Sequence, residues 1–278
     1  MLDWKQPQEP LFSHYFIVDQ MAENAERGKK PQAFDTPFRY SDSGKCARAM
    51  SYSALGYEGE PFDAPSTFVT GLGTHIHELV QAAIGKRHPD AQFEVASQVM
   101  TSSGHTDGII PGTALGKVQY ELKSMGGTAY KKSIGVNTRG LTEPSGPRFS
   151  AVLQAALNAQ ANDCDTIVIG HIALEAISRQ MAIRLELSEA RRFIAEWFIP
   201  KEVWEPLADG EILRQHRIIE DLDEGFLPPP IAIDDDGVGV NLDPSNNRYW
   251  QCHYCSYKTQ CEADGPGRVA VSIERGDN

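Results

Sequence analysis

The sequence has no apolar run of the roughly 18–20 residues that a helix needs to cross a bilayer. Its N-terminal stretch, MLDWKQPQEPLFSHYF, also lacks the basic region followed by an apolar run that marks a secretory signal. We therefore expect a protein of the cytoplasm with no membrane partner. Positive charge is scarce as well, because 26 Lys and Arg residues stand against 38 Asp and Glu residues, for a net charge of −12. This balance argues against a protein that coats nucleic acid through bulk electrostatics, but it leaves room for a local basic groove.

Cysteine is also rare, but four of the five cysteines form a pattern that packing does not explain. Cys252, Cys255 and Cys261 follow one another as Cys-x2-Cys-x5-Cys, and Cys46 stands alone far upstream. In a reducing compartment, clustered thiols bind metal more often than they form disulfides. The fifth thiol, Cys164, lies in an apolar helical stretch and is predicted to belong to the core.

Two kinds of metal centre suit four thiolates. Zinc sites usually combine two paired Cys-x2-Cys knuckles. Iron–sulfur clusters tolerate irregular spacing with one distant ligand. Only one knuckle is paired in this sequence, so we favour a [4Fe–4S] cluster and keep zinc as the alternative.

Hydrophobic periodicity and turn residues predict a mixed α/β fold. Helices are predicted at residues 41–55, 66–87, 149–162, 188–198 and 209–223. Strands are predicted at residues 93–101, 105–110, 117–123, 166–174 and 180–187. Pro200 and Pro206 are expected to break or kink the chain between the last two helices. Gly71 and Gly73, in the second helix, permit a close approach by a neighbouring element.

The composition divides the chain into four parts. We expect a surface lead-in at residues 1–40, a core at 41–225, a connector with the cysteine cluster at 226–264, and a disordered tail at 265–278. No internal repeat is visible.

Three charged side chains are predicted to meet at one end of the sheet. Asp107 ends one strand, and Glu121-Leu122-Lys123 lies on the next. Because strand residues alternate between faces, Glu121 and Lys123 share a face and Leu122 points into the core. Asp107 and Glu121 can share a hard cation such as Mg²⁺ or Mn²⁺, which activates a bound water. Lys123 can orient that water and stabilise the developing charge, although the same spacing also occurs on ordinary exposed strands.

Two flanking residues strengthen this prediction. A histidine on the helix before the sheet can reach the same metal, and Gln154 lies on the helix after it. His75 and His77 are both candidates, but they point about 200° apart on a helix, so only one can face the site. Its spacing from Gly73 favours His77.

Together with the cysteines, this series resembles the PD-(D/E)xK nuclease superfamily, specifically the RecB-like iron–sulfur exonucleases found among CRISPR-associated proteins. The matching elements span residues 46–261, and the cysteine arrangement is their most specific part. The resemblance implies a restriction-endonuclease-like core, in which helices flank a small mixed sheet. It also implies metal-dependent cleavage of DNA, typically from the ends of single strands, with the C-terminal cysteine cluster tied to an N-terminal helix.

The resemblance assigns a role to each matching residue. The catalytic residues would be Asp107, Glu121, Lys123 and Gln154. The Mg²⁺ or Mn²⁺ ligands would be His77, Asp107, Glu121 and the backbone carbonyl of Leu122. The [4Fe–4S] ligands would be Cys46, Cys252, Cys255 and Cys261. The family often carries Gln-x-x-x-Tyr, whereas Asn158 stands here, so an aromatic residue for substrate stacking is missing.

Residues 124–148 are rich in Gly, Ser, Thr and Pro and are predicted to form a mobile loop beside this site. Their basic residues are Lys131, Lys132, Arg139 and Arg148. These side chains are predicted to hold the DNA backbone, and the alternative is an ordinary solvated linker.

These features favour a DNA exonuclease that acts in recombination, repair or CRISPR adaptation. No helicase P-loop occurs in the sequence, so any unwinding requires a partner helicase or another recombination or CRISPR protein. Two alternatives remain: a non-catalytic DNA-binding or adaptor protein on a nuclease scaffold, and a zinc-stabilised interaction module.

Overall fold

The computed structural model describes residues 34–61, 64–137, 139–245 and 249–271, together with the single positions 19 and 22. Most of the expected lead-in at 1–40 and the end of the expected tail therefore lie outside the described residues. Within the described part, no helix combines the length and the apolar character that a membrane crossing requires.

A mixed four-stranded sheet forms the centre of the fold, in keeping with the predicted mixed α/β class. Its strands, in spatial order, are β4 (Gly108–Thr113), β5 (Gly116–Met125), β8 (Thr166–Ala173) and β9 (Ile194–Pro200). The two central strands, β5 and β8, run parallel, and the two edge strands pair with them in antiparallel fashion. β8 is covered on both faces, since Ile167 and Ile169 pack into one apolar cluster and Val168 and Ile172 into another on the opposite side.

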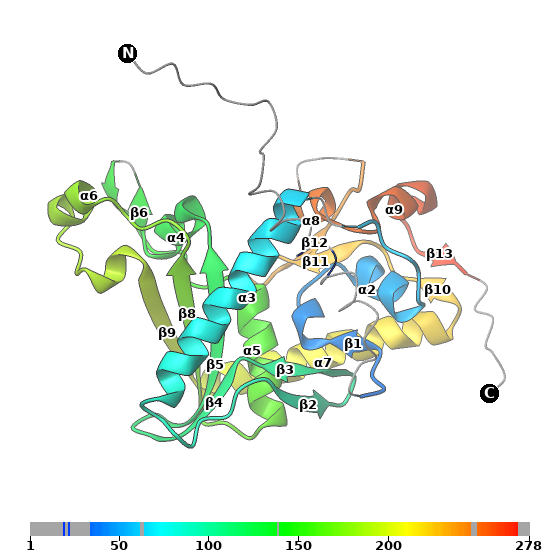
Figure 1. Cartoon of the computed structure of the whole chain (residues 1–278). Helices are drawn as coiled ribbons and strands as arrows, with labels where there is room; N and C mark the ends of the chain where they lie inside the picture. Colours follow the sequence, from blue (N-terminus) through cyan, green and yellow to red (C-terminus); the bar gives the residue numbers. More distant parts are fainter. Residues whose placement is uncertain are drawn as a thin grey trace, which may run out of the picture.

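Helices cover both faces of this sheet (Figure 1). On one face, the long helix α3 (Ala64–Gly85) packs Ile76, Val80 and Ile84 against an apolar cluster that includes Leu122 of β5. On the other face lie α5 (Phe149–Ala161) and α7 (Lys201–Asp223). Four of the eight buried residues of α5 are alanines, whose small side chains permit close packing.

The predicted close approach at the α3 glycines is also present. A Cβ atom at Gly73 would lie 2.9 Å from the Oγ of Ser124 on β5, so only glycine fits without a shift of that side chain. The absence of a side chain at Gly73 therefore lets α3 lie against the strand that carries Glu121 and Lys123.

A second, smaller sheet precedes the central one. It contains β1 (Phe38–Arg39), β3 (Ser102–Thr106) and β2 (Val95–Val99), in that spatial order. The predicted strand at 105–110 is interrupted, since β3 ends at Thr106 and β4 begins at Gly108. Asp107 occupies the bend between the two strands, so its side chain does not follow the up-and-down alternation of side chains along β3 or β4.

The predictions for residues 180–198 were wrong in both elements. The predicted strand at 180–187 is instead the short helix α6 (Arg179–Arg184), whose N-cap Ser178 accepts a hydrogen bond from the backbone N–H of Met181. The predicted helix at 188–198 is a 3-10 turn, η2 (Ala190–Arg192), followed by β9. The sequence Ile-Ala-Glu-Trp-Phe-Ile suits a strand, and pairing with β8 outweighs the helical pattern.

The prediction of a break at Pro206 was also wrong. α7 begins at Lys201, directly after Pro200, and continues through Pro206 to Asp223. Pro206 removes the N–H that would bond the carbonyl of Glu202. Both residues are exposed, so water can bond that carbonyl and the helix continues.

The segment predicted as a loop at 124–148 has regular structure. It contains α4 (Gly127–Ser133) and a hairpin of β6 (Val136–Asn137) and β7 (Gly140–Leu141). Tyr130 is fully buried against Ile134 and Ile177, and its hydroxyl donates to the carbonyl of Arg191 at 2.9 Å. One buried aromatic side chain thus anchors a segment whose composition is typical of loops.

The N-terminal and C-terminal parts of the described chain pack together. The helix predicted at 41–55 is divided into the 3-10 turn η1 (Tyr40–Asp42) and α2 (Ala47–Ala54). After α7 come β10 (Phe226–Leu227), β11 (Ile231–Ile233), β12 (Gly239–Asn241), α8 (Trp250–His253), α9 (Lys258–Asp264) and β13 (Val269–Ala270). β13 pairs with β10, so part of the tail that we expected to be disordered is hydrogen-bonded.

The last helices lie beside α2, although the sequence separates them widely (Figure 1, red beside blue). The Tyr52 hydroxyl of α2 donates to the Asp264 carboxylate of α9 at 2.6 Å. Arg48, fully buried in α2, donates to three backbone carbonyls, those of Pro228, Gly265 and Gly267. These contacts hold the C-terminal segment against the N-terminal helix.

The central sheet supplies a test of where the stability of the fold lies. Ile169→Ala on β8 removes a fully buried side chain and leaves a cavity, so we expect it to lower the free energy of unfolding by about 2–5 kcal/mol. Phe198→Ala on edge strand β9 removes a side chain that is 68% exposed, and we expect a change within about 0.5 kcal/mol. Urea titrations of both variants measure the difference, and equal losses would contradict this placement of the core.

Candidate active site

Asp107 is fixed by the backbone of the neighbouring strand. Its Oδ2 accepts a hydrogen bond from the N–H of Leu122 on β5 at 2.7 Å. Its own carbonyl accepts from the side-chain amide of Gln81 on α3 at 2.9 Å. The N–H and C=O of a strand residue point to the same side, so the carbonyl of Leu122 also faces Asp107.

Glu121 and Lys123 share one face of β5, as their spacing predicts, and the side chain of Leu122 lies on the opposite face. Lys123 Nζ lies 2.7 Å from Glu121 Oε1 and donates to Gln154 Oε1 of α5 at 3.0 Å. Glu121 is 1% exposed, and its second oxygen, Oε2, has no protein partner among the described residues. A buried carboxylate oxygen without a partner is costly, so this atom is suited to bind a cation or a water.

Burial governs the electrostatics of this pair. It raises the pKa of Glu121 to about 7, against the opposing effect of the Lys123 ammonium. Burial alone would lower the pKa of Lys123, but the Glu121 carboxylate outweighs it and the net shift is upward. Lys123 is therefore held as a cation. The Glu121 carboxylate beside it has a raised pKa, so binding of a proton or a metal cation to it is favoured.

His77, and not His75, lies beside Asp107. Its Nδ1 is 3.4 Å from Asp107 Oδ1, whereas the His75 side chain is 53% exposed and contacts Glu78. Burial would lower the pKa of His77, but the Asp107 carboxylate outweighs it and raises the pKa. The structure thus brings together the six predicted residues of this site, namely His77, Asp107, Glu121, Leu122, Lys123 and Gln154.

The donor set fits a hard divalent cation. It offers two carboxylates, an imidazole and a backbone carbonyl, which are oxygen-rich ligands of the kind that Mg²⁺ and Mn²⁺ take. The unpartnered, buried Glu121 Oε2 is the observation that carries this fit. No group of three His, Cys, Asp or Glu side chains in the described residues is already arranged to hold a metal. Here the side chains bond one another, as His77 does with Asp107 and Lys123 with Glu121.

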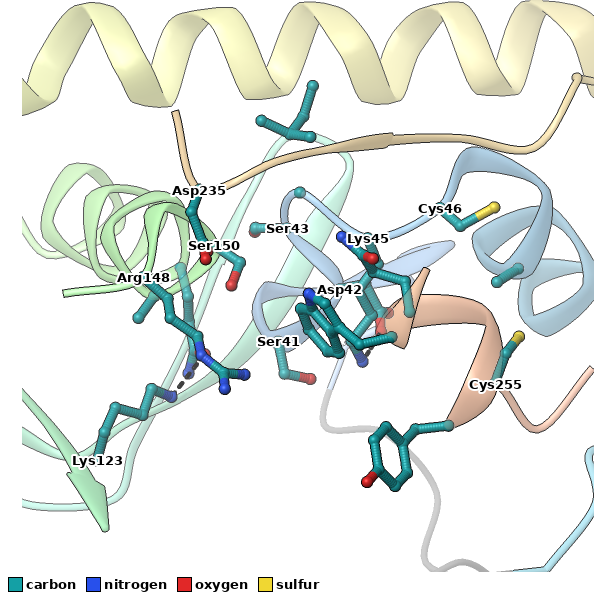
Figure 2. Close-up of a pocket in the computed structure, with 18 of the residues that line it drawn as sticks. Ser41, Asp42, Ser43, Lys45, Cys46, Lys123, Arg148, Ser150, Asp235 and Cys255 are labelled. Carbon is teal, nitrogen blue, oxygen red and sulfur yellow. Dashed lines mark hydrogen bonds and ion pairs between the residues drawn. The ribbon is translucent and has the colours of Figure 1, made fainter. Parts of the chain in front are cut away.

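A cavity of about 710 Å³ extends from this site toward the cysteine segment (Figure 2). Lys123 and Gln154 lie at one part of its lining, and Cys46 and Cys255 at another. Of the four basic residues predicted to bind DNA, only Arg148 lines the cavity. The other three, Lys131, Lys132 and Arg139, lie on α4 and in the hairpin that follows, outside this lining.

One residue of this region escaped the sequence prediction. His171 on β8 is paired in register with Lys123, lines the cavity and is 1% exposed. Its Nδ1 lies 3.1 Å from Ser133 Oγ, and its ring contacts the edge of Trp197. Burial, with the nearby cations Lys123 and Arg148, lowers the pKa of His171 to about 4. The sequence feature that could have indicated this residue is a single histidine in the otherwise mostly apolar strand Thr-Ile-Val-Ile-Gly-His-Ile-Ala.

The four predicted cluster ligands line a second, small cavity of about 20 Å³. They come from separate elements, since Cys46 caps α2, Cys252 lies in α8, Cys255 follows α8 and Cys261 lies in α9. None of the five cysteines forms a disulfide. Cys164 lies apart from this cavity in the main core, as predicted.

The chemistry of this cavity fits a thiolate-bound metal centre. Burial raises the pKa of Cys46 to about 12 and that of Cys252 to about 11, so the thiols hold their protons until a metal displaces them. The buried cation Arg48 is close enough to Cys261 to oppose the upward shift of its pKa. Arg48 has no carboxylate partner among the described residues, and thiolates would balance its charge.

Four cysteine thiols around one small cavity suit either metal candidate. The cavity of about 20 Å³ offers the space of roughly one water, which a single ion such as zinc can occupy. The spacing of the cysteines favours the cluster, so both candidates stand.

The fold is of the mixed α/β class, with a mixed sheet and with the site on two of its neighbouring strands. No protein-family model and no curated protein matches the chain. Among solved structures it is similar to a crystal structure of SSO0001, with a TM-score of 0.49 and 15% identity over 91% of this chain and 98% of that one. It is also similar to a crystal structure of LHK-Exo in complex with dAMP, with a TM-score of 0.34 and 13% identity over 67% and 95%. With TM-scores below 0.5 and identities this low, neither likeness assigns a family to this chain or a role to any of its residues.

The lowered pKa of His171 predicts a change of stability with pH. The imidazole ordinarily titrates at 6.5 and in the folded protein at about 4, so between these values the unfolded chain binds a proton that the folded protein does not. The contribution of His171 is therefore complete above pH 6.5 and is lost as the pH falls toward 4, by at most about 3 kcal/mol.

Urea titrations at several pH values measure this contribution. We expect His171→Gln to flatten the decline of unfolding free energy between pH 6.5 and 4. His105→Gln, which changes an exposed histidine of β3, is the control and should retain the wild-type slope. An unchanged slope in His171→Gln would show that this imidazole is not held neutral by the fold.

Proposed function

We propose that this protein is a Mg²⁺- or Mn²⁺-dependent deoxyribonuclease that trims single strands or DNA ends. The observation that carries the proposal is the buried Glu121 carboxylate. One of its oxygens contacts Lys123, the other has no partner, and the charge of Asp107 acts on the same group. A buried anion between a cation and a second anion has little purpose in packing, but it suits the binding of a divalent ion.

Each residue has a distinct task in this proposal. Asp107, Glu121, His77 and the Leu122 carbonyl would hold the ion. A bound divalent ion lowers the pKa of a water molecule and polarises the phosphoryl oxygen. Lys123 holds a positive charge where the negative charge of the transition state develops, and Gln154 fixes the direction of its ammonium.

The reaction is the hydrolysis of a phosphodiester. The oxygen of water forms a bond to phosphorus, and the bond from phosphorus to one sugar oxygen breaks. The water proton leaves the site, and the departing sugar oxygen takes up a proton to become a hydroxyl. The products are a phosphate monoester and an alcohol.

The cysteine centre has a structural task in the same proposal. Cys46, Cys252, Cys255 and Cys261 would hold a [4Fe–4S] cluster, which would tie α8 and α9 to α2 beside the cavity that Lys123 lines. A zinc ion would make the same tie. An enzyme of this kind takes part in recombination, repair or CRISPR adaptation, where a partner helicase or recombination protein supplies single strands.

One observation favours a second candidate. In the described residues, no three His, Cys, Asp or Glu side chains are arranged to hold a metal. A DNA-binding or adaptor protein on an inactive nuclease scaffold would have this property. Asp107, Glu121 and Lys123 argue for the enzyme, because a scaffold without chemistry has no need to keep a costly buried charge pair.

The carboxylates provide the direct test of catalysis. We expect Asp107→Ala and Glu121→Ala each to slow the cleavage of a labelled single-stranded oligonucleotide at least about 100-fold, which corresponds to roughly 3 kcal/mol of transition-state stabilisation. Asp90→Ala, which removes an exposed carboxylate after α3, is the matched control and should cut at the wild-type rate. Full activity of both site variants with Mg²⁺ and Mn²⁺ would contradict the nuclease proposal.

The cysteines provide a separate test of the metal centre. We expect Cys46→Ser and Cys255→Ser each to lower the bound metal and the melting temperature, because a metal that joins distant segments adds its binding energy to folding. Cys164→Ser is the control, since its thiol lies in the core. Metal analysis of protein purified without oxygen distinguishes iron from zinc, and the visible spectrum gives a second reading, since only the cluster is brown. Retention of full metal by Cys46→Ser would show that the ligand set is misassigned.

A further inference from the structure

An exposed tryptophan lies at the wall of the large cavity. Trp250 of α8 is 48% exposed, whereas Trp204, in the core, is 1% exposed. Aromatic side chains of this size normally bury most of their surface, so an exposed one in a cavity is suited to contact a ligand. Tyr254, one helical turn further on, lines the same cavity and is 67% exposed.

The Arg148 guanidinium lies over the ring of this tryptophan. Its guanidinium carbon lies 4.9 Å from the centre of the Trp250 ring. A guanidinium that stacks through its face keeps the N–H groups at its edge free for a phosphate. The Arg148 side chain makes no hydrogen bond or ion pair within the described chain, which is unusual in a protein of net charge −12.

The other charges of the cavity direct an anion toward this pair. Lys45 is bound to Asp42 at 3.1 Å, and Lys123 is bound to Glu121, so both of these cations are already compensated. Asp235 also lines the cavity and repels phosphate from its side (Figure 2). Arg148 is therefore the cation of the lining that has no anionic partner among the described residues.

We propose that Arg148 and Trp250 form a nucleotide subsite, in which an unpaired base stacks on the indole ring and the adjacent phosphate binds the edge of the guanidinium. This inference rests on the proposed nuclease function and specifies its substrate as single-stranded DNA. Bases of a duplex are paired and stacked on one another, so their faces are not open to a side chain. A strand held here reaches Lys123 through the same cavity, and Tyr254 offers a second stacking surface.

Two oligonucleotides separate base stacking from phosphate binding. The probes are a fluorescent oligothymidylate and an abasic strand of equal length, and affinity is measured by anisotropy without added divalent metal. We expect Trp250→Ala to weaken binding of the oligothymidylate about 10-fold and to leave binding of the abasic strand unchanged, since one stacked base contributes about 1.4 kcal/mol. Trp250→Phe should restore most of the affinity.

Arg148→Gln has a different expected signature. It should lower the affinity for both oligonucleotides by the same factor. The slope of log affinity against log salt should become shallower by about 0.7, the value for one phosphate contact on a single strand. Phe198→Ala is the matched control, because Phe198 is an exposed aromatic on β9 outside the cavity.

Three outcomes would overturn the subsite. If Trp250→Ala binds both strands as tightly as the wild type, the ring does not stack on bases. If Trp250→Ala lowers the affinity for both strands equally while Tyr254→Ala changes neither affinity, Trp250 only maintains the shape of the cavity. If the wild-type protein binds neither strand, the nuclease proposal fails and this subsite fails with it. Failure of the variant alone leaves the nuclease proposal intact.

Discussion

The hydrogen bond from the Leu122 N–H to the Asp107 carboxylate sets the geometry of the whole site. It holds the bend between β3 and β4 against β5 and turns the Leu122 carbonyl toward the same carboxylate. Because Leu122 is locked in this way, its neighbours Glu121 and Lys123 must project from the opposite face of the strand. That face is covered by α5, which is why Gln154 can reach the lysine. One backbone contact thereby positions groups from four separate elements.

The same site concentrates charge in the interior of the fold. Glu121 is buried, and removing its carboxylate from water carries a cost that its ion pair with Lys123 offsets in part. His171 adds no third positive charge beside Lys123 and Arg148, because burial lowers its pKa to about 4 and keeps the imidazole neutral at neutral pH. The fold obtains its stability elsewhere, from the apolar layers between α5, α7 and the sheet. A site with buried charges beside a well-packed apolar core is common in proteins whose function depends on preorganised charge.

The sequence predicted those features that follow from short-range periodicity. Alternation along β5 placed Glu121 and Lys123 on one face, and the glycine at position 73 indicated where a helix meets that strand. Elements decided by distant partners could not be predicted in this way. Residues 194–200 form a strand because β8 offers a free edge, and 124–148 are ordered because Tyr130 fills a hydrophobic pocket. His171 was missed because nothing in its neighbours shows that β8 pairs with β5 in a register that brings it to Lys123.

The short distance along the chain between Trp250 and Cys252 has a consequence for the protein over its lifetime. Trp250 is separated from Cys252 by one residue within the four residues of α8, so the aromatic wall of the large cavity and a cysteine of the small one move as one piece. If the proposed metal centre is bound there, an oxidant or a stronger chelator that releases Cys252 would also free the Trp250 ring next to Arg148. Loss of the metal during storage would then loosen the wall of the cavity that is proposed to bind DNA.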